Sequence, residues 1–356
     1  MDRLHLDFDR RSYDIFIGDT LEAVLNSGAF HGKVLLITDS NVARLYADIV
    51  SEHLMKNGAE RVYPFVFAAG EQQKNIKTLE QIWDACISNG LDRHSTIIAL
   101  GGGVVGDMAG FAASTFMRGI RFVQIPTTLL AQTDSSVGGK VGIDYGGVKN
   151  IVGSFLQPAS VHIATQTLQT LPDREFGAGM AEVVKYGVIC DGAFFGFLKD
   201  NLIKIQEHDS EVLAQVIYQC CRLKARVVME DERETGMRAI LNFGHTIGHG
   251  IESAMDFELL HGECVGLGML AALQIACSRG MADAALCDDV HDLLIAFGLP
   301  VTVCCEREKI LFYMHNDKKK ENGSLRFVLP DGLGRAKIVR DVSAGEIDAA
   351  IDKITL

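Results

Sequence analysis

Histidine and glutamate residues at helical spacing give this sequence its clearest indication of chemistry. His245, His249 and Glu252 stand three or four residues apart, so a helix would place them on one side. His261 follows shortly afterwards and begins another predicted helix. Imidazoles from two neighbouring helices can bind one cation, which then needs a third ligand and an open position for water or substrate. The pattern predicts a catalytic metal site.

Glu182 is the best candidate for the third ligand. It lies in an otherwise apolar predicted helix, and a buried carboxylate requires a cation or strong hydrogen-bond donors. Two histidines and one glutamate form an established catalytic zinc set. The alternative for any single histidine is a structural or surface position, which is the prediction for His5, His31, His94, His162, His208, His291 and His315.

A glycine-rich turn indicates a second kind of binding. Gly101, Gly103 and Gly106 form G-x-G-x-x-G between a predicted strand and a predicted helix. Glycine lets the backbone approach a pyrophosphate, and the start of a helix adds N–H donors. A tight strand–helix turn without a ligand explains the glycines equally well. Asp39 ends an earlier predicted strand, where it either accepts from ribose hydroxyls or caps the next helix.

Several cationic residues stand beside glycine, asparagine or apolar residues. Each one alone is more often a solvated surface residue than a functional one. Together they suit a substrate with more than one anionic group, such as a phosphate and a carboxylate. The residues are Arg118, Lys140, Lys149, Lys185, Lys224 and Arg238, with Lys318 and Lys319 in a later cluster.

The composition limits the class of protein and its partners. The chain has 356 residues, of which 48% are apolar and 22% charged, so two globular domains are expected. A net charge of −12 repels nucleic acid and anionic membranes at long range. No secretory signal or membrane helix is predicted, and the nine cysteines include no CxxC pair. We expect a cytoplasmic protein with reduced thiols and with no nucleic acid or membrane as a partner.

The pattern of predicted elements changes along the chain. Apolar runs that alternate with amphipathic helices are typical of a parallel, doubly wound sheet. Such strands are predicted over residues 33–39, 62–67, 95–100 and 122–125, with helices over 41–57 and 78–88. Later helices are predicted over 176–186, 211–231, 239–254, 262–278 and 284–296, with one strand over 324–329. The predicted fold class is an α/β Rossmann-like domain over residues 1–170 followed by an all-α domain over 171–356.

Six segments in order carry a specific resemblance. They are GGGVVGD (101–107), QIPTTLLAQTDSSVGGK (124–140), KN (149–150), GMAEVVKYG (179–187), RxxxNFGHTxGH (238–249) and HGE (261–263). Together they resemble the 3-dehydroquinate synthase family of sugar-phosphate cyclases. The resemblance covers nearly the whole chain, although the first 30 residues and those after about residue 330 carry little of it.

The resemblance implies a reaction and its cofactors. NAD would be held by the Rossmann-like domain and Zn²⁺, or Co²⁺, by the helical domain, usually in a homodimer. The implied sugar-phosphate substrate is 3-deoxy-D-arabino-heptulosonate 7-phosphate, and the products are 3-dehydroquinate and phosphate, in the shikimate route to aromatic amino acids. The implied steps are transient oxidation, β-elimination of phosphate, reduction and intramolecular aldol closure, with no net oxidation.

The resemblance also implies site residues by position. The metal ligands would be Glu182, His245 and His261. The NAD contacts would be Asp39, Asn41, Glu71, Lys74, Gly102, Gly103, Val104, Asp107, Thr127, Thr128, Leu130, Asp134, Ser135, Lys140, Lys149, Thr170 and Leu171. The substrate and catalytic residues would be Arg118, Asp134, Lys140, Asn150, Lys185, Lys224, Arg238, Asn242, His249 and one of Lys318 and Lys319. His249 is expected to relay protons.

Three other functions fit parts of the same pattern. Sugar-phosphate cyclases that make 2-deoxy-scyllo-inosose or valiolone precursors share the implied fold, but Arg118, Asn242, His249 and the Lys318–Lys319 pair match the dehydroquinate type. A metal-dependent alcohol or glycerol dehydrogenase would reduce NAD with net turnover and would not need so many cations. A non-catalytic binding protein would not need an intact set of metal ligands and lysines.

Overall fold

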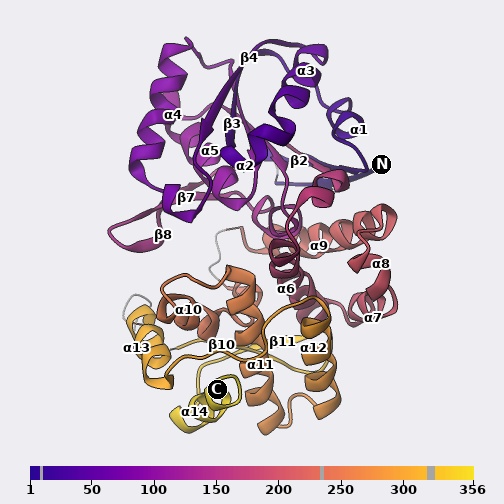
Figure 1. Cartoon of the computed structure of the whole chain (residues 1–356), viewed down its shortest axis with the longest axis vertical. Coiled ribbons are helices and arrows are strands. Elements are labelled where there is room, and N and C mark those ends of the chain that lie inside the picture. Colours follow the sequence, from indigo (N-terminus) through magenta and orange to yellow (C-terminus); the bar gives the residue numbers. More distant parts are fainter. Residues whose placement is uncertain (9–10, 233–235, 319–324) are drawn as a thin grey trace. The chain divides into compact units, whose positions relative to one another are not determined.

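The computed structural model describes residues 1–8, 11–232, 236–318 and 325–356, and it divides into two compact units. The first unit comprises Met1–Leu171 and Ser210–Arg233, and the second comprises Pro172–Asp209 and Glu234–Leu356 (Figure 1). A single division at residue 170 would place the long helix α9 (Ser210–Glu230) in the second part of the chain, whereas it groups with the first unit.

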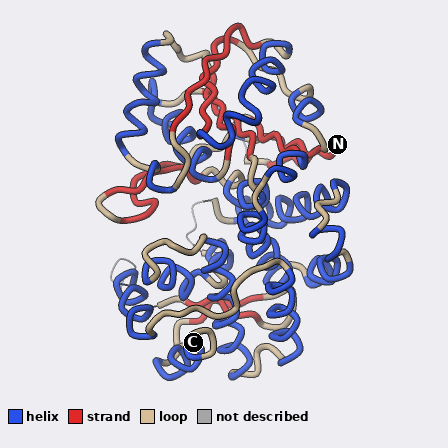
Figure 2. Tube along the Cα trace, in the orientation of Figure 1, coloured by secondary structure: helices blue, strands red, loops and turns tan. Residues whose placement is uncertain are grey.

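A seven-stranded sheet is the centre of the first unit (Figure 2). All neighbouring strands are parallel except for the antiparallel pair β1 and β2, so the predicted parallel sheet is confirmed. The order is β1 (Asp2–Leu6), β2 (Tyr13–Gly18), β9 (Ser160–Ala164), β6 (Arg121–Pro126), β5 (Thr96–Gly101), β3 (Gly32–Asp39) and β4 (Ala59–Phe67). The sequence did not predict β1, β2 or β9.

Helices cover both faces of this sheet (Figure 1). Leu35 and Ile37 of β3 pack with α4 (Ile76–Ser88) and α5 (Gly103–Thr115). Val34 and Leu36 of the same strand pack in the cluster that includes α1 (Leu21–Leu25) and α3 (Asp48–Lys56). Because successive side chains point to opposite faces, a strand buried on both sides reads as a continuous apolar run. This explains why the central strands were recognisable from the sequence.

Short elements complete the first unit. The helix predicted over residues 41–57 consists of three consecutive helical segments, with a π-helical segment in the middle. The remaining elements are α2 (Ser40–Val42), η2 (Ala43–Ala47), η3 (Glu71–Gln73), η4 (Phe116–Arg118), η5 (Ala131–Ser135), η6 (Thr165–Thr170) and the antiparallel hairpin β7 (Lys140–Tyr145) and β8 (Val148–Phe155).

The second unit is helical, as predicted, with one small two-stranded sheet. The prediction of a single helix over residues 239–254 is wrong. Gly244 adopts a left-handed φ of 83°, and this turn separates two helical segments. The elements are α6 (Asp173–Cys190), α7 (Gly192–Asp200), α8 (Leu202–Gln206), η7 (Met237–Asn242), α10 (His245–Ala254), α11 (His261–Ser278), α12 (Ala284–Ala296), α13 (Arg307–Lys318), β10 (Phe327–Pro330), β11 (Ala336–Val339) and α14 (Ala344–Asp352).

Two cysteines differ from the expectation of reduced thiols. Cys277 of α11 and Cys287 of α12 are paired as a disulfide, so the prediction is wrong for this pair. Among the residues that the structure describes, no helix has the length and apolar character needed to cross a membrane.

His162 is a structural histidine in β9 of the first unit. Its side chain is fully buried, with Nε2 2.9 Å from Ser160 Oγ and Nδ1 2.8 Å from the Val24 carbonyl oxygen. The ring also stacks against Phe16. Burial lowers the pKa of His162 from 6.5 to about 4, against the opposing effect of the Val24 carbonyl. The neutral ring is therefore the form that the fold accommodates.

Acid is expected to destabilise the protein through His162. Between pH 6.5 and about 4 the unfolded chain binds a proton that the folded chain does not, so the free energy of unfolding falls as the pH is lowered through this window. The expected loss is about 3 kcal/mol. Urea unfolding at a series of pH values measures it, and His162→Gln, which keeps one donor and one acceptor, should show a shallower dependence. Equal dependence in the two proteins would contradict this role.

Candidate active site

Glu182 and Lys185 lie one turn apart on α6 of the second unit. Their side chains are only 1% and 2% exposed, and Lys185 Nζ forms an ion pair with Glu182 Oε2. A buried carboxylate is stable only with cationic or hydrogen-bonding partners. The helix therefore presents a negative ligand oxygen with a positive group already beside it.

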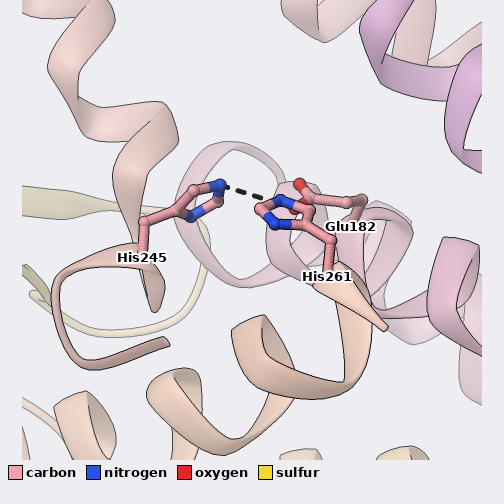
Figure 3. A group of neighbouring side chains, drawn as sticks. All are labelled: Glu182, His245 and His261. Carbon is pink, nitrogen blue, oxygen red and sulfur yellow. Dashed lines mark ion pairs between the residues drawn. The ribbon is translucent and has the colours of Figure 1, made fainter. Parts of the chain in front are cut away.

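His245 and His261 complete a group that could hold a metal ion. Each is the first residue of its helix, and each places Nε2 3.6 Å from Glu182 Oε1. The three ligand atoms lie within 4.8 Å of one another, and Figure 3 shows both rings beside the carboxylate. One carboxylate oxygen and two imidazole nitrogens form a donor set suited to Zn²⁺ and also to Co²⁺. The structure thus brings together the three residues predicted as metal ligands.

The two histidines differ in their electrostatic surroundings. Burial lowers the pKa of His245 to about 3, although the charge of Glu182 acts in the opposite direction. Burial also opposes charge on His261, but the carboxylates of Glu182 and Glu252, which lie 3.6 and 3.7 Å from its two ring nitrogens, outweigh it and raise the pKa to about 9. His245 would therefore be available as a neutral ligand at pH 7, whereas a cation that bound His261 would displace a proton.

His249 lies next to these ligands without belonging to the same triad. Its ring centroid is 5.3 Å from that of His245 and 5.9 Å from that of His261. The residue is exposed, whereas Glu182 is fully enclosed. A solvent-exposed imidazole at this position can exchange protons with a molecule bound to the cation.

An ion pair between an exposed arginine and a buried glutamate secures the start of α11, a feature that was not predicted from the sequence. Arg174 of α6 donates from Nε and Nη2 to the two oxygens of Glu263, at 2.7 Å each. Glu263 also accepts from the Leu260 backbone N–H at 2.7 Å, which completes a capping arrangement. The pair therefore links the helix that carries Glu182 to the helix that begins with His261. A glutamate three residues after the helix cap was the available signal.

The glycine-rich turn in the first unit connects β5 to α5. Gly102 is the N-cap, and Gly103 is the first helical residue, so Val104 and Asp107 lie on the first turns of α5. A Cβ on Gly102 would lie 3.0 Å from Thr128, and one on Gly103 would lie 3.3 Å from Ser135 Oγ. The turn, Thr128 and Ser135 thus form one compact group at a helix start, where backbone N–H groups can accept a phosphate.

A polar cluster around the buried side chain of Lys74 lies beside this helix in the first unit. Lys74 Nζ is 2.6 Å from Asp107 Oδ2 and 2.5 Å from Asn150 Oδ1. Burial opposes charge on Lys74, but Asp107 and Glu71 outweigh it and raise the pKa of the ammonium. Lys149 lies 3.8 Å from Glu71, so five predicted residues form one cluster. Asp144 also belongs to it, since it accepts from the Asn150 N–H at 2.8 Å, and the sequence analysis missed this residue.

Other predicted cofactor residues lie at or beside the ends of elements in the first unit. Asp39 caps α2 by accepting from the backbone N–H groups of Asn41 and Val42, which is one of the two roles weighed from the sequence. Thr170 Oγ1 lies 2.6 Å from Tyr46 OH at the end of η6, directly before Leu171. Thr127 is buried after β6, and Leu130 precedes η5.

The predicted substrate residues are spread over several elements. In the first unit, Lys224 of α9 contacts Asp134 of η5 with Nζ 3.0 Å from Oδ1, whereas Arg118 and Lys140 are exposed. In the second unit, Arg238 is buried in η7 and Asn242 ends the same segment, separated from α10 by the turn at Gly244. Lys319 and the side chain of Lys318 lie outside the described residues.

Two family descriptions match the chain. Residues 64–178 match the 3-dehydroquinate synthase N-terminal family, and residues 179–320 match the 3-dehydroquinate synthase C-terminal family. A 3-dehydroquinate synthase from Desulforamulus reducens is 46% identical over 360 residues, covering 99% of this chain and 100% of the relative.

Solved structures of related enzymes have the same fold. A 2-epi-5-epi-valiolone synthase from Streptomyces hygroscopicus subsp. jinggangensis 5008, with NAD⁺ and Zn²⁺ bound, is 27% identical with a TM-score of 0.89 and covers 96% of each chain. A 2-deoxy-scyllo-inosose synthase, complexed with carbaglucose-6-phosphate, NAD⁺ and Co²⁺, is 28% identical with a TM-score of 0.89 and covers 98% of this chain and 99% of its own. On its sequence matches, this chain belongs to the 3-dehydroquinate synthase family.

Proposed function

We propose that this protein is a 3-dehydroquinate synthase that converts 3-deoxy-D-arabino-heptulosonate 7-phosphate into 3-dehydroquinate and phosphate. The observation that carries the proposal is the full-length match at 46% identity to a relative of that name. The convergence of Glu182, His245 and His261 supports it, because a lyase of this kind needs a cation at the reacting hydroxyls. The name implies a role in the shikimate pathway to aromatic amino acids.

The same proposal assigns a cofactor to each unit. The first unit would hold NAD at the Gly102–Gly103 turn, and NAD bound in the related cyclases supports this assignment. The second unit would hold Zn²⁺ or Co²⁺ on Glu182, His245 and His261, a donor set that fits both ions. When bound, NAD supplies reversible hydride transfer and the cation supplies Lewis acidity toward a substrate hydroxyl.

The chain's own residues would position the substrate and move protons. Lys185, fixed by its ion pair with Glu182, keeps a positive charge beside the metal ligands, where it favours a developing alkoxide. His249 is exposed next to His245 and would carry protons between substrate and solvent. The proposed anion-binding residues, which would hold phosphate and carboxylate, are Arg118, Lys140, Asn150, Lys224, Arg238, Asn242 and one of Lys318 and Lys319.

Removing the charge of Lys140 is expected to weaken substrate binding. A charge-assisted hydrogen bond to an anion is worth about 1.5–3 kcal/mol, so Lys140→Met should raise the substrate dissociation constant by about 10- to 100-fold. Calorimetric titration with a non-reactive substrate analogue measures this change. Lys77→Met, at an exposed position on α4, is the matched control and should bind normally. An unchanged affinity in Lys140→Met would count against its place in the substrate site.

The proposal includes a homodimer in the cytoplasm. Large apolar side chains are exposed on the β7–β8 hairpin, including Tyr145, Ile151 and Phe155, and such side chains are suited to a contact with a second chain. Light scattering coupled to gel filtration should give twice the mass of one chain. A monomer at micromolar concentration would remove the dimer from the proposal.

A comparison of three substrates tests the assignment against other sugar-phosphate cyclases. The protein, supplied with NAD and Zn²⁺, is mixed separately with 3-deoxy-D-arabino-heptulosonate 7-phosphate, glucose 6-phosphate and sedoheptulose 7-phosphate. We expect cyclisation of the first substrate only. Cyclisation of either of the other two in preference would assign the protein to the chemistry of one of its structural neighbours.

A further inference from the structure

The two candidate metal-binding histidines use their ring nitrogens in the same way. Each directs Nε2 toward Glu182 Oε1, at 3.6 Å. The other nitrogen of His245, Nδ1, lies 3.1 Å from the Phe243 carbonyl oxygen, which can only accept a hydrogen bond. His245 therefore carries its proton on Nδ1 and leaves the Nε2 lone pair for a cation.

His261 has a carboxylate where His245 has a carbonyl. Its Nδ1 lies 3.7 Å from Oε1 of Glu252, two turns along α10 from His245. Glu252 is 5% exposed, so its charge is held close to the ring rather than in solvent. Its backbone is also secured, because its carbonyl accepts from the Phe257 N–H at 3.1 Å in the turn that ends α10.

A second carboxylate near His261 is already committed to other partners. Glu263 stands two residues after His261, but both of its oxygens accept from Arg174 and one accepts from the Leu260 N–H. Glu263 therefore orders the helix start, and Glu252 is the carboxylate that faces Nδ1 of the His261 ring.

We propose that Glu252 is a positioning residue of the metal site, which holds the His261 ring with Nδ1 protonated and Nε2 directed at the cation. The inference rests on the proposed function, since it requires that Glu182, His245 and His261 bind a metal. Carboxylates behind metal-binding histidines fix the ring and make it a stronger ligand, and their loss typically weakens metal binding by 10- to 100-fold. Glu252 also balances the charge that a divalent cation brings into this enclosed region, together with Glu182.

A second cation is the alternative explanation for Glu252. His249, Glu252 and His261 also have ligand atoms within 4.8 Å of one another. In that arrangement His261 would bridge two cations through its two nitrogens, and neither nitrogen would keep a proton. The number of ions bound by each chain separates this alternative from the proposal.

Cobalt titration tests the role of Glu252 without measuring turnover. Metal-free protein is titrated with Co²⁺ against a competing chelator, and the visible absorption bands report the ligand geometry. We expect one Co²⁺ per chain, with affinity reduced by about 10-fold in Glu252→Gln and by up to about 100-fold in Glu252→Ala, and with shifted bands in both. Glu346→Gln, which removes a carboxylate paired with Arg279 elsewhere in the same unit, should bind as the wild type does.

The possible outcomes distinguish failure of this inference from failure of the proposed metal site. Wild-type affinity and an unchanged spectrum in both Glu252 variants would overturn the positioning role alone. Two Co²⁺ per chain in the wild type would replace it with a bridged pair of ions. No Co²⁺ binding by the wild type would overturn both the inference and the metal site on which it rests. Urea unfolding of each metal-free variant shows whether the fold itself has changed, which would instead indicate a purely structural role.

Discussion

Replacing His261 with alanine is expected to abolish turnover of 3-deoxy-D-arabino-heptulosonate 7-phosphate while the protein stays folded. The substitution removes one of three ligand atoms that lie within 4.8 Å of one another, and the remaining Glu182 and His245 would hold a cation weakly. Metal ions contribute several kcal/mol of transition-state stabilisation, so the rate should fall by about a thousandfold or more. Phosphate release under saturating substrate and NAD measures the loss.

His291→Ala is the matched control for this experiment. His291 lies on the exposed side of α12, beside Asp292, and is not among the ligand groups of the described residues. Its replacement should leave both the metal content and the rate unchanged. Full activity of a metal-stripped His261→Ala protein would show that the proposed metal site has no part in the reaction.

Adding one methyl group at Gly268 is expected to destabilise the second unit severely. A Cβ at this position would lie 1.8 Å from the Gly244 carbonyl oxygen, far inside van der Waals contact. Gly244 forms the turn that starts α10, so α10 and α11 would have to separate, and each of these helices begins with a proposed metal ligand. Overpacking of this kind costs about 3 kcal/mol or more, and Gly268→Ala should lose metal affinity as well.

Gly266→Ala on the same helix provides the control. A Cβ there would meet only Leu294, at 3.8 Å, which is ordinary contact. Because alanine is the better helix former, Gly266→Ala should be neutral or more stable by up to about 1 kcal/mol. Urea unfolding of both variants gives the comparison. Similar stability in the two proteins would show that Gly268 of α11 does not lie so close to Gly244 before α10.

The central strands β3, β5 and β6 could be predicted from the sequence because they are buried on both faces, whereas the equally buried β9, which contains Ser160 and His162, was missed. Val34 to Ile37 supply core residues to two opposite clusters, which makes the strand a continuous apolar run. The edge strand β1 is mostly exposed, and the hairpin strand β8 has no buried residue, so neither shows such a run. The break at Gly244 was missed because helical spacing continues across it, and only the left-handed φ reveals the turn.

The sequence indicated the candidate residues of the site better than it indicated the contacts between them. His245, His261 and Glu182 were recognisable because polar side chains are rare in apolar helices. The role of Asp39 as a helix cap could not be chosen over ribose binding, since one residue type suits both. The Arg174–Glu263 pair and the contact of Glu252 with His261 join residues up to 89 positions apart, and spacing along one helix does not reveal such pairs.

The most direct test of the proposed reaction follows three signals from one mixture of protein, NAD, Zn²⁺ and 3-deoxy-D-arabino-heptulosonate 7-phosphate. Phosphate is assayed, the carbon product is identified by NMR, and NADH is followed by its absorbance. The account predicts equal amounts of phosphate and 3-dehydroquinate with no accumulation of NADH, because the oxidation is reversed in every cycle. Accumulation of NADH without phosphate release from folded, metal-loaded protein would contradict it and indicate a dehydrogenase instead.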